Sequence, residues 1–311
     1  MPLRKVKVSI IIINWNTKKL LAECLDSISE FAEDISNEII VVDNASEDGS
    51  QEMLKEFYPN VQLIENEHNT GFARANNQAV KVSSGDYVLL LNSDARLTAF
   101  SLQNLIELAE KNPTAGLVGA RLLNPDGSFQ ASHTPFPTLW REFLILSGLG
   151  RFFSDSWYPS RGPEIEKGIQ QVDYVEGACL FCRKDIYLQA GGLDEAYFMY
   201  AEEVDLCFAI RKAGYQVWYH PEARIIHHGG ASSINRRTQR EGDLYSSRIR
   251  FFKKNYGQFQ ANLLTLMMYF FIFLKSIIHK LMRFLSAGKK GRDVISYKEF
   301  RQKLIETNCF P

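Results

Sequence analysis

The chain of 311 residues has only five cysteines, and its N-terminus lacks a hydrophobic run long enough for a signal-peptide core. Cys179 and Cys182 form a CxxC pair, but no second pair follows at zinc spacing. An odd number of cysteines without a secretory signal is typical of a reducing cytoplasm. These absences argue against a disulfide framework and a zinc site, so we expect the CxxC thiols to be inert in a buried strand.

Two phosphate-binding motifs are also missing. No GxGxxG follows the first apolar segment, and no GxxxxGK[ST] occurs anywhere in the chain. This argues against the usual dinucleotide-binding fold and against P-loop NTPases. A sugar-nucleotide-forming nucleotidyltransferase is disfavoured as well, because no glycine-rich loop bearing Lys or Arg follows the first strand. Any bound nucleotide must be held in another way.

The formal net charge is zero, but charge is distributed unevenly along the chain. Residues 1–235 carry 20 Lys and Arg against 31 Asp and Glu, whereas residues 236–311 carry 16 against 5. The apolar fraction of 45% and the charged fraction of 23% are ordinary for a soluble globular protein. An acidic body followed by a basic tail predicts that the tail meets an anionic surface.

Short apolar, β-rich segments alternate with segments of helical periodicity over the first hundred residues. Continuous apolar strands separated by helices are typical of a parallel sheet covered on both faces. The pattern therefore predicts half of a doubly wound α/β fold. We expect strands at 8–13, 39–42, 61–64 and 87–91, and helices at 18–31, 50–57 and 72–82.

Each of the four expected strands ends in amide or carboxylate side chains. Asn and Asp favour turns, so one such ending would carry little information. In open α/β sheets, however, ligands bind outside the carboxyl ends of the strands. Four polar endings at one edge of a sheet therefore predict a polar ligand. The endings are Asn14-Trp15-Asn16, Asp43-Asn44, Glu65-Asn66 and Asn92-Ser93-Asp94.

Two carboxylates at this edge suggest a nucleoside diphosphate. Asp43, when ionised, only accepts hydrogen bonds, which suits ribose hydroxyls or the N–H of a base. Asp94 follows a buried strand, and hard cations such as Mg²⁺ bind through one or two carboxylates plus substrate phosphates. Together the two would hold a nucleoside diphosphate between them.

Seven motifs occur in order along the chain: "SIIIINWN", "IIVVDNASEDGS", "NTGFARANN", "LLLNSDA", "VDYVEGACLFCRKD", "GGLDEAYFMYAEEVDLC" and "HHGGASS". Over residues 6–257 the chain resembles the inverting family-2 glycosyltransferases, most closely their rhamnosyltransferase-like branch. The resemblance implies an α/β GT-A fold. Its doubly wound mixed sheet would contain a Rossmann-like nucleotide-binding half, and C-terminal helices would follow.

The resemblance implies a donor site at the ends of the first strands. Trp15 matches an aromatic residue that packs on the nucleobase, and Asp43 matches the carboxylate that reads base or ribose. Arg74 is expected to face the diphosphate, with a solvated arginine as the alternative. The implied nucleotide-sugar-binding set is Asn14, Trp15, Asn16, Asp43, Asn44, Ser46, Arg74, Asn76 and Asn92.

A metal site follows from the same resemblance. Asp94 matches the last acid of the family's Asp-x-Asp motif, and His227 matches a late histidine that completes the metal site in some relatives. His228 is the neighbouring alternative. The implied cofactor is Mg²⁺ or Mn²⁺, although Asn92 replaces the first acid of the motif and predicts a weaker metal affinity.

The family's catalytic base matches Glu203, where relatives carry Asp. Glu202 and Asp205 are rivals for the role. Residues one apart on a helix point about 100° away from each other, so Glu202 and Glu203 cannot both face the acceptor. A base works best with its pKa near ambient pH, and a neighbouring carboxylate raises it toward that range.

The resemblance implies an enzyme that transfers a sugar with inversion in cell-surface polysaccharide assembly. The rhamnosyltransferase-like branch implies that this sugar is rhamnose. The donor would be dTDP- or UDP-linked, and the acceptor a glycan or a polyprenol-linked glycan. No nucleic acid is expected as a partner. The alternative is a non-catalytic nucleotide-sugar-binding subunit or sensor, supported only by Asn92 and Glu203.

We expect a glycosyltransferase domain over residues 1–257, with a nucleotide-binding half near 1–98 and an acceptor half near 115–235. Residues 258–311 would form a basic, amphipathic helical tail. Its apolar part, 263–274, reaches only ~18 Å as a helix, short of the ~30 Å hydrocarbon core. Lys275, His279 and Arg283 then form a polar stripe. The tail therefore predicts a cytoplasmic enzyme bound to the anionic inner face of the cell membrane. The alternative is a C-terminal helix that packs on the domain or on a second subunit of a homo-oligomer.

Overall fold

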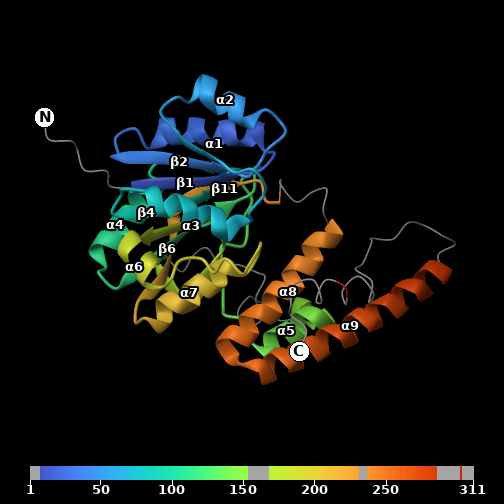
Figure 1. Ribbon diagram of the computed structural model, residues 1–311. Coiled ribbons are helices and arrows are strands. Elements are labelled where there is room, and N and C mark those ends of the chain that lie inside the picture. Colours follow the sequence, from blue (N-terminus) through green and yellow to red (C-terminus); the bar gives the residue numbers. More distant parts are fainter. Residues whose placement is uncertain (1–7, 153–167, 231–236, 286–301, 303–311) are drawn as a thin grey trace, which may run out of the picture. The chain divides into compact units, whose positions relative to one another are not determined.

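The computed structural model describes residues 8–152, 168–230, 237–285 and 302, which form two compact units (Figure 1). The first unit comprises residues 1–136, 160–198 and 202–232, and the second comprises 137–159, 199–201 and 233–311. The sequence-based boundary after residue 257 differs from this division, since residues 233–257 belong with the tail.

The first unit is built on a mixed sheet with the strand order β3-β2-β1-β4-β10-β6-β11-β5. The first four strands of the chain pair in parallel, as their continuous apolar runs predict. β10 runs antiparallel to both β4 and β6, β11 is parallel to β6, and β8 and β5 pair with β11 antiparallel. The strands are β1 (Val8–Asn14), β2 (Asn37–Asp43), β3 (Gln62–Glu65), β4 (Tyr87–Asn92), β5 (Ala95–Leu97), β6 (Ala115–Leu123), β8 (Gln170–Val172), β10 (Cys179–Arg183) and β11 (Gln216–His227). A separate ribbon pairs β7 (His133–Thr134) with β9 (Tyr174–Val175).

Helices cover both faces of this sheet, and each face has its own apolar core. Successive strand residues point to opposite faces, so Ile10 and Ile12 of β1 join one core while Ile11 joins the other. The first core includes α1 (Lys18–Phe31), α2 (Ser50–Phe57) and α4 (Ser101–Lys111). The second includes α3 (Phe72–Val82), α6 (Lys184–Gln189) and α7 (Glu202–Lys212). This doubly wound mixed sheet confirms the predicted fold class.

The elements predicted over the first hundred residues are confirmed almost residue for residue. The helices 18–31, 50–57 and 72–82 have the predicted bounds, and each strand begins and ends within two residues of its predicted position. The CxxC pair is buried on β10, as expected. Burial raises the pKa of Cys179 to about 12, which keeps this thiol protonated and unreactive.

The second unit packs three helices together: α5 (Leu139–Ser147), α8 (Arg237–Tyr256) and α9 (Gln258–Leu285). A 3₁₀ turn, Leu149–Phe152, follows α5. Arg248 of α8 donates to the buried Glu142 of α5 across 2.6 Å, and Phe143 meets Phe271 of α9 edge to face. α9 extends the expected apolar segment upstream and continues well past it as one helix.

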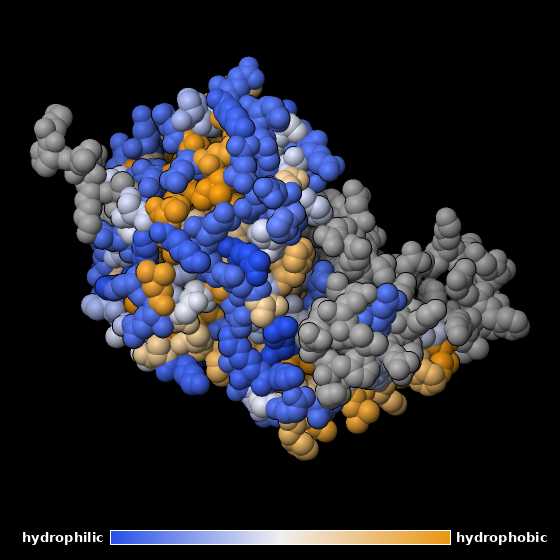
Figure 2. Space-filling model, in the orientation of Figure 1, coloured by the Kyte–Doolittle hydropathy of each residue, from blue (hydrophilic) through white to orange (hydrophobic). Residues whose placement is uncertain are grey.

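α9 carries apolar residues on an exposed face as well as on the buried one. Figure 2 shows hydrophobic surface along this helix. Among the described helices, α9 is the one long and apolar enough to cross a membrane, over Gln258–Ile278, and a third of that window is buried. The side chains of His279 and Arg283 lie outside the described residues, so the predicted polar stripe stays a prediction. The exposed apolar residues are Phe259, Leu263, Leu266, Phe270, Phe273, Leu274, Ile277 and Ile278.

Candidate functional site

The polar strand endings meet at one edge of the sheet, as predicted. In the strand register Asn14 lies opposite Asp43, and Asp43 lies opposite Glu65. Asn92 lies opposite Ile13, one residue before Asn14. The endings of β1, β2, β3 and β4 therefore form one continuous polar edge, because parallel strands bring their carboxyl ends to the same side.

Asp43 is completely buried at this edge and accepts hydrogen bonds from three protein donors. Oδ2 accepts from Asn14 Nδ2 at 2.7 Å, while Oδ1 accepts from the Ser46 amide at 2.8 Å and from Gln51 Nε2 at 2.7 Å. A carboxylate offers about four lone-pair positions. Asp43 therefore fixes the loop after β2 and retains capacity for roughly one further donor.

The loop after β1 is tied to the loop after β2 by the predicted polar residues. The Asn14 amide also donates to Ser46 Oγ, which accepts from the Asn16 backbone N–H as well. Asn16 Oδ1 in turn accepts from the backbone N–H of Glu47 at 2.7 Å. These contacts hold half-buried Trp15 at the sheet edge between two anchored asparagines.

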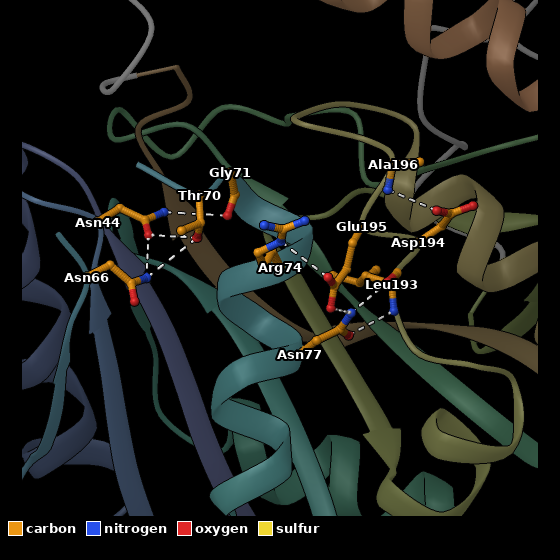
Figure 3. A network of polar contacts seen from close by, with 10 residues as sticks. All are labelled: Asn44, Asn66, Thr70, Gly71, Arg74, Asn77, Leu193, Asp194, Glu195 and Ala196. Atoms are coloured by element: carbon orange, nitrogen blue, oxygen red, sulfur yellow. Dashed lines mark hydrogen bonds and ion pairs between the residues drawn. The ribbon is translucent and has the colours of Figure 1, made fainter. Parts of the chain in front are cut away.

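Asn44 continues this network toward α3 (Figure 3). Its Oδ1 accepts from Asn66 Nδ2 at 2.9 Å and from Thr70 Oγ1 at 3.2 Å, and its amide reaches the carbonyl of Gly71 at 3.5 Å. Gly71 has φ of 86°, and a Cβ there would lie 2.8 Å from the carbonyl oxygen of Phe198. Only glycine fits this turn, which opens α3 directly against the segment before α7.

Two further side chains of α3 hold the segment that leads toward α7 (Figure 3). Arg74 is exposed, and its Nε pairs with Glu195 Oε2 at 3.2 Å. Asn77 donates to the Leu193 carbonyl at 2.7 Å and accepts from the Leu193 N–H at 3.1 Å. Asn76 is buried, and its Oδ1 has no partner within the described chain. Asn77 and Glu195 were absent from the predicted site, because their partners lie more than a hundred positions away.

The predicted metal residues meet at the end of β4. His227 Nε2 lies 3.2 Å from Asp94 Oδ1 and 3.3 Å from Asn92 Nδ2, while the other ring nitrogen lies 2.6 Å from Gln130 Oε1. The backbone N–H of His228 donates to the Asp94 carbonyl, and its side chain makes no contact with Asp94 in the described hydrogen bonds. The geometry thus favours His227 over its neighbour.

The pair of Asp94 and His227 fits a divalent cation. Adjacent ligands of an octahedral ion with bonds of about 2.1 Å lie about 3 Å apart, close to the observed separation of 3.2 Å. Within the described residues no group of three or more His, Cys, Asp or Glu side chains could hold a metal ion. The pair would supply two ligands and leave the other positions to water and substrate phosphates.

Three acids open α7: Glu202 and Asp205 are buried, whereas Glu203 is partly exposed. Glu202 is 5% exposed, and its Oε2 has no hydrogen-bond partner among the described residues. Burial raises the pKa of Glu202 to about 7. For Glu203, burial together with the negative charges of Glu202 and Glu176 holds the pKa well above its usual range.

Backbone strain accompanies these acids. Tyr200 and Ala201, which directly precede α7, have φ of 72° and 65°. Such left-handed conformations of non-glycine residues cost ~1–2 kcal/mol each and cluster at functional sites. Glu203 packs over Gly177, where an added Cβ would lie 3.6 Å from its Cγ. The sequence motif identified the acids but not Glu176, since Glu176 lies 27 positions before Glu203, directly after β9.

A protein-family model described as glycosyl transferase family 2 matches residues 9–185. An N-acetylglucosaminyl-diphospho-decaprenol L-rhamnosyltransferase of Mycobacterium tuberculosis is 32% identical over 208 residues, covering 63% of this chain and 67% of the relative. A low-salt glycan biosynthesis hexosyltransferase of Haloferax volcanii is 26% identical over 210 residues, covering 66% of this chain and 62% of the relative.

Two solved structures have a similar fold. The crystal structure of GalNAc-T7 with UDP, GalNAc and Mn²⁺ has a TM-score of 0.54 at 12% identity, covering 80% of this chain and 51% of that one. The S. aureus TarS structure has a TM-score of 0.51 at 15% identity, covering 86% and 70%. At these identities the likeness shows the fold alone, which is the GT-A fold of glycosyltransferases.

Proposed function

We propose a specific reaction for this chain, which belongs to glycosyl transferase family 2 and is a glycosyltransferase. It transfers rhamnose from a dTDP- or UDP-linked donor, with inversion, to a polyprenol-linked glycan in cell-surface polysaccharide assembly. The rhamnosyltransferase of M. tuberculosis supports this choice of donor sugar and acceptor. The observation that carries the proposal is that Asp43 and the Asp94–His227 pair lie at the same edge of the sheet, at the ends of β2 and β4, which both pair with β1.

The donor nucleotide lies along the polar edge in this proposal. Trp15 packs on the base, and the remaining lone pair of Asp43 accepts from ribose or base. Asn14, Asn16 and Ser46 keep that carboxylate and the neighbouring loop in place through their mutual hydrogen bonds. Such pre-organised contacts reduce the ordering cost of nucleotide binding.

The leaving diphosphate is neutralised beside Asp94 and His227. A bound Mg²⁺ or Mn²⁺ would supply electrostatic stabilisation of the negative charge that develops on the diphosphate. Asn92 and Asp94 hold this side of the donor at the end of β4. Arg74, which pairs with Glu195, adds a positive charge at the N-terminal turn of α3.

Glu203 acts as the general base. Its carboxylate takes the proton of the acceptor hydroxyl, and the hydroxyl oxygen attacks C1 of the sugar from the face opposite the diphosphate. The bond between C1 and the phosphate oxygen breaks, its electron pair leaves with the diphosphate, and the configuration at C1 inverts. A raised pKa suits this role, because a base is most effective near the working pH.

Donor binding and turnover test the proposal separately. Thermal-shift measurements against UDP-, dTDP- and GDP-sugars should show the largest stabilisation with dTDP-rhamnose or UDP-rhamnose, since a ligand stabilises the state it binds. Incubation with that donor and a polyprenol-diphosphate-linked sugar should then yield a rhamnosylated lipid and free nucleoside diphosphate. Binding without turnover on any lipid or glycan acceptor would favour a nucleotide-sugar sensor instead.

The exposed face of α9 supports a peripheral position on the cytoplasmic leaflet of the cell membrane. Eight large apolar side chains are exposed along this helix, and no Asp or Glu occurs between residues 258 and 285. An apolar face with only basic charges suits an anionic lipid surface. It would bring the enzyme to a polyprenol-linked acceptor.

Vesicle sedimentation tests this position. The protein should co-sediment with vesicles rich in anionic lipid at low salt, and Phe270→Glu with Phe273→Glu should release it without changing its fold. Both side chains are more than half exposed, so the substitutions leave the helix packing intact. A protein that stays in the supernatant but sediments as a dimer in the ultracentrifuge would assign the face to a second copy of the chain.

A further inference from the structure

Gln130 lies at the end of the turn that follows β6, and its side-chain amide has a defined orientation. Its Nε2 donates to Asn124 Oδ1 at 3.0 Å and to the backbone carbonyl of His227 at 3.2 Å. Asn124 is oriented in turn, because its own amide donates to Ser128 Oγ and to the Phe129 carbonyl. With both Nε2 partners being acceptors, Oε1 of Gln130 must be the atom that faces His227.

This orientation decides which nitrogen of His227 carries the proton. Gln130 Oε1 only accepts, so Nδ1 of His227, 2.6 Å away, donates its N–H to it. In a neutral imidazole the other nitrogen then keeps its lone pair. That nitrogen, Nε2, is the one that lies 3.2 Å from Asp94 Oδ1.

The surrounding backbone leaves room for this contact. Gly229 has φ of 72°, and a Cβ added there would lie 3.3 Å from Gln130 Nε2 and 3.9 Å from His227 Cε1. A larger residue at this position would crowd the amide and strain the backbone. The turn after β6 and Gly229 thus together hold the imidazole of His227 in one orientation.

We propose that Gln130 is a positioning residue that holds His227 in the Nδ1–H tautomer, so that Nε2 and Asp94 Oδ1 together bind a divalent cation. The inference rests on the metal site of the proposed function. Histidines that bind metals commonly donate their second ring N–H to an oxygen acceptor, and loss of that acceptor typically weakens metal affinity ~10–100-fold. Nothing in the residue types alone marks Gln130 for this role.

Two substitutions separate positioning from simple packing. Gln130→Met keeps the length of the side chain but removes the acceptor for Nδ1–H. Gln130→Glu keeps an acceptor oxygen for Nδ1–H and loses only the two Nε2 donor contacts. Titration of free Mn²⁺ by electron paramagnetic resonance, with and without UDP or dTDP, should show ~10–100-fold weaker binding by Gln130→Met. Gln130→Glu should bind within about threefold of wild type or more tightly.

A second readout follows the tautomer directly. The ¹⁵N spectrum of the six histidines, with His227 assigned by comparison with His227→Gln, should show a protonated Nδ1 in the wild type and in Gln130→Glu. Gln130→Met should shift His227 toward the Nε2–H tautomer. An unchanged tautomer in Gln130→Met, or equal loss of Mn²⁺ affinity in both variants, would overturn the proposal.

The failure of this inference and of the proposed function are distinguishable. A wild-type protein that transfers sugar but binds no Mn²⁺, with or without a nucleoside diphosphate, would refute the role of Gln130 and leave the function intact. A protein that binds Mn²⁺ with the predicted dependence on residue 130 but turns over no donor would support this inference and contradict the function.

Discussion

Asp43 and Glu202 are both buried carboxyl groups of the first unit, but their surroundings differ. Asp43, at the end of β2, accepts hydrogen bonds from three donors, which lie at the end of β1, in the loop after β2 and in α2. Glu202, at the start of α7, leaves its Oε2 without a partner among the described residues. Both are at most 5% exposed, so burial alone does not distinguish them.

This difference in hydrogen bonding suits the different roles proposed for the two regions, donor binding around Asp43 and proton transfer at the start of α7. Satisfied hydrogen bonds compensate the desolvation of a buried carboxylate and hold it rigidly. An unsatisfied one costs free energy unless the group is protonated, which is why burial raises the pKa of Glu202 to about 7. In the proposed function, the polar edge would keep its shape around the donor, and the acids of α7 would exchange protons.

The acid cluster should show the largest effect of a single substitution. Glu203→Gln preserves the shape of the side chain but removes the proton acceptor, so turnover should fall by ~10²–10⁴. Affinity for the donor should stay within a few-fold of wild type, because the polar edge is formed by the ends of β1, β2, β3 and β4 and not by α7. Steady-state kinetics with calorimetric donor binding measures both quantities.

Glu202→Gln is the matched control for this prediction. Side chains one residue apart on a helix point about 100° away from each other, so only one of Glu202 and Glu203 can face the acceptor. An active Glu203→Gln together with an inactive Glu202→Gln would show that the base is Glu202.

Glu202 should also make stability depend on pH. Its pKa is about 7 in the folded protein and near 4.5 when unfolded, so the folded state binds the proton more tightly. This contribution to stability is fully present below pH 4.5 and is lost as the pH rises through 7, by up to ~3 kcal/mol. Glu202→Gln should therefore be more stable than wild type at pH 8 and show no such advantage at pH 4.5. Chemical denaturation at both pH values measures this, and parallel pH profiles for the two proteins would contradict it.

Asp43→Ala should weaken nucleotide binding ten- to hundredfold, since a charge-assisted hydrogen bond is worth ~1.5–3 kcal/mol. The same substitution should also lower stability, because it leaves the three donors around Asp43 without their acceptor. Each donor left without a partner costs ~1–3 kcal/mol, so the variant should also unfold at lower denaturant concentration.

Glu47→Ala provides the comparison for Asp43→Ala, because Glu47 is exposed in the same loop and takes part only through its backbone N–H. Calorimetry with UDP and dTDP should detect nearly wild-type affinity in this control. Equal affinities in both variants would remove Asp43 from the donor site.

The smallest effect is expected at Asn92, where the family's first metal-motif acid is replaced. Asn92→Asp adds a carboxylate beside Asp94 and His227, so Mn²⁺ affinity should rise by about tenfold, or ~1.4 kcal/mol. Without the metal, the added negative charge should lower the melting temperature slightly through repulsion with Asp94. A thermal-shift titration with MnCl₂ reports both changes, and an unaltered midpoint would show that residue 92 does not face the metal.

Local patterns were sufficient to predict much of the fold. The helices at 18–31, 50–57 and 72–82 have their predicted bounds because apolar periodicity and turn residues act over a few positions. The meeting of the polar strand endings at one edge was also predictable, since parallel strands bring their ends to one side whatever lies between them. The ion pair of Arg74 could not be predicted from local patterns, because its partner Glu195 lies 121 positions away.

The α/β class, the polar edge after β1, β2, β3 and β4, and the family of the chain all follow from the order of its residues. Hydrophobic periodicity predicts which face a residue occupies, and it needs no knowledge of distant partners. Which side chains meet at the edge depends instead on how distant segments pack. Gln130 and His227 are 97 positions apart, and a hydrogen bond between them depends on tenths of an ångström set by β6, β11 and the turns that follow them. The same packing leaves Glu202 Oε2 without a hydrogen-bond partner among the described residues, while it surrounds Asp43 with three donors. Both residues carry a carboxyl group, so residue type alone does not predict this difference.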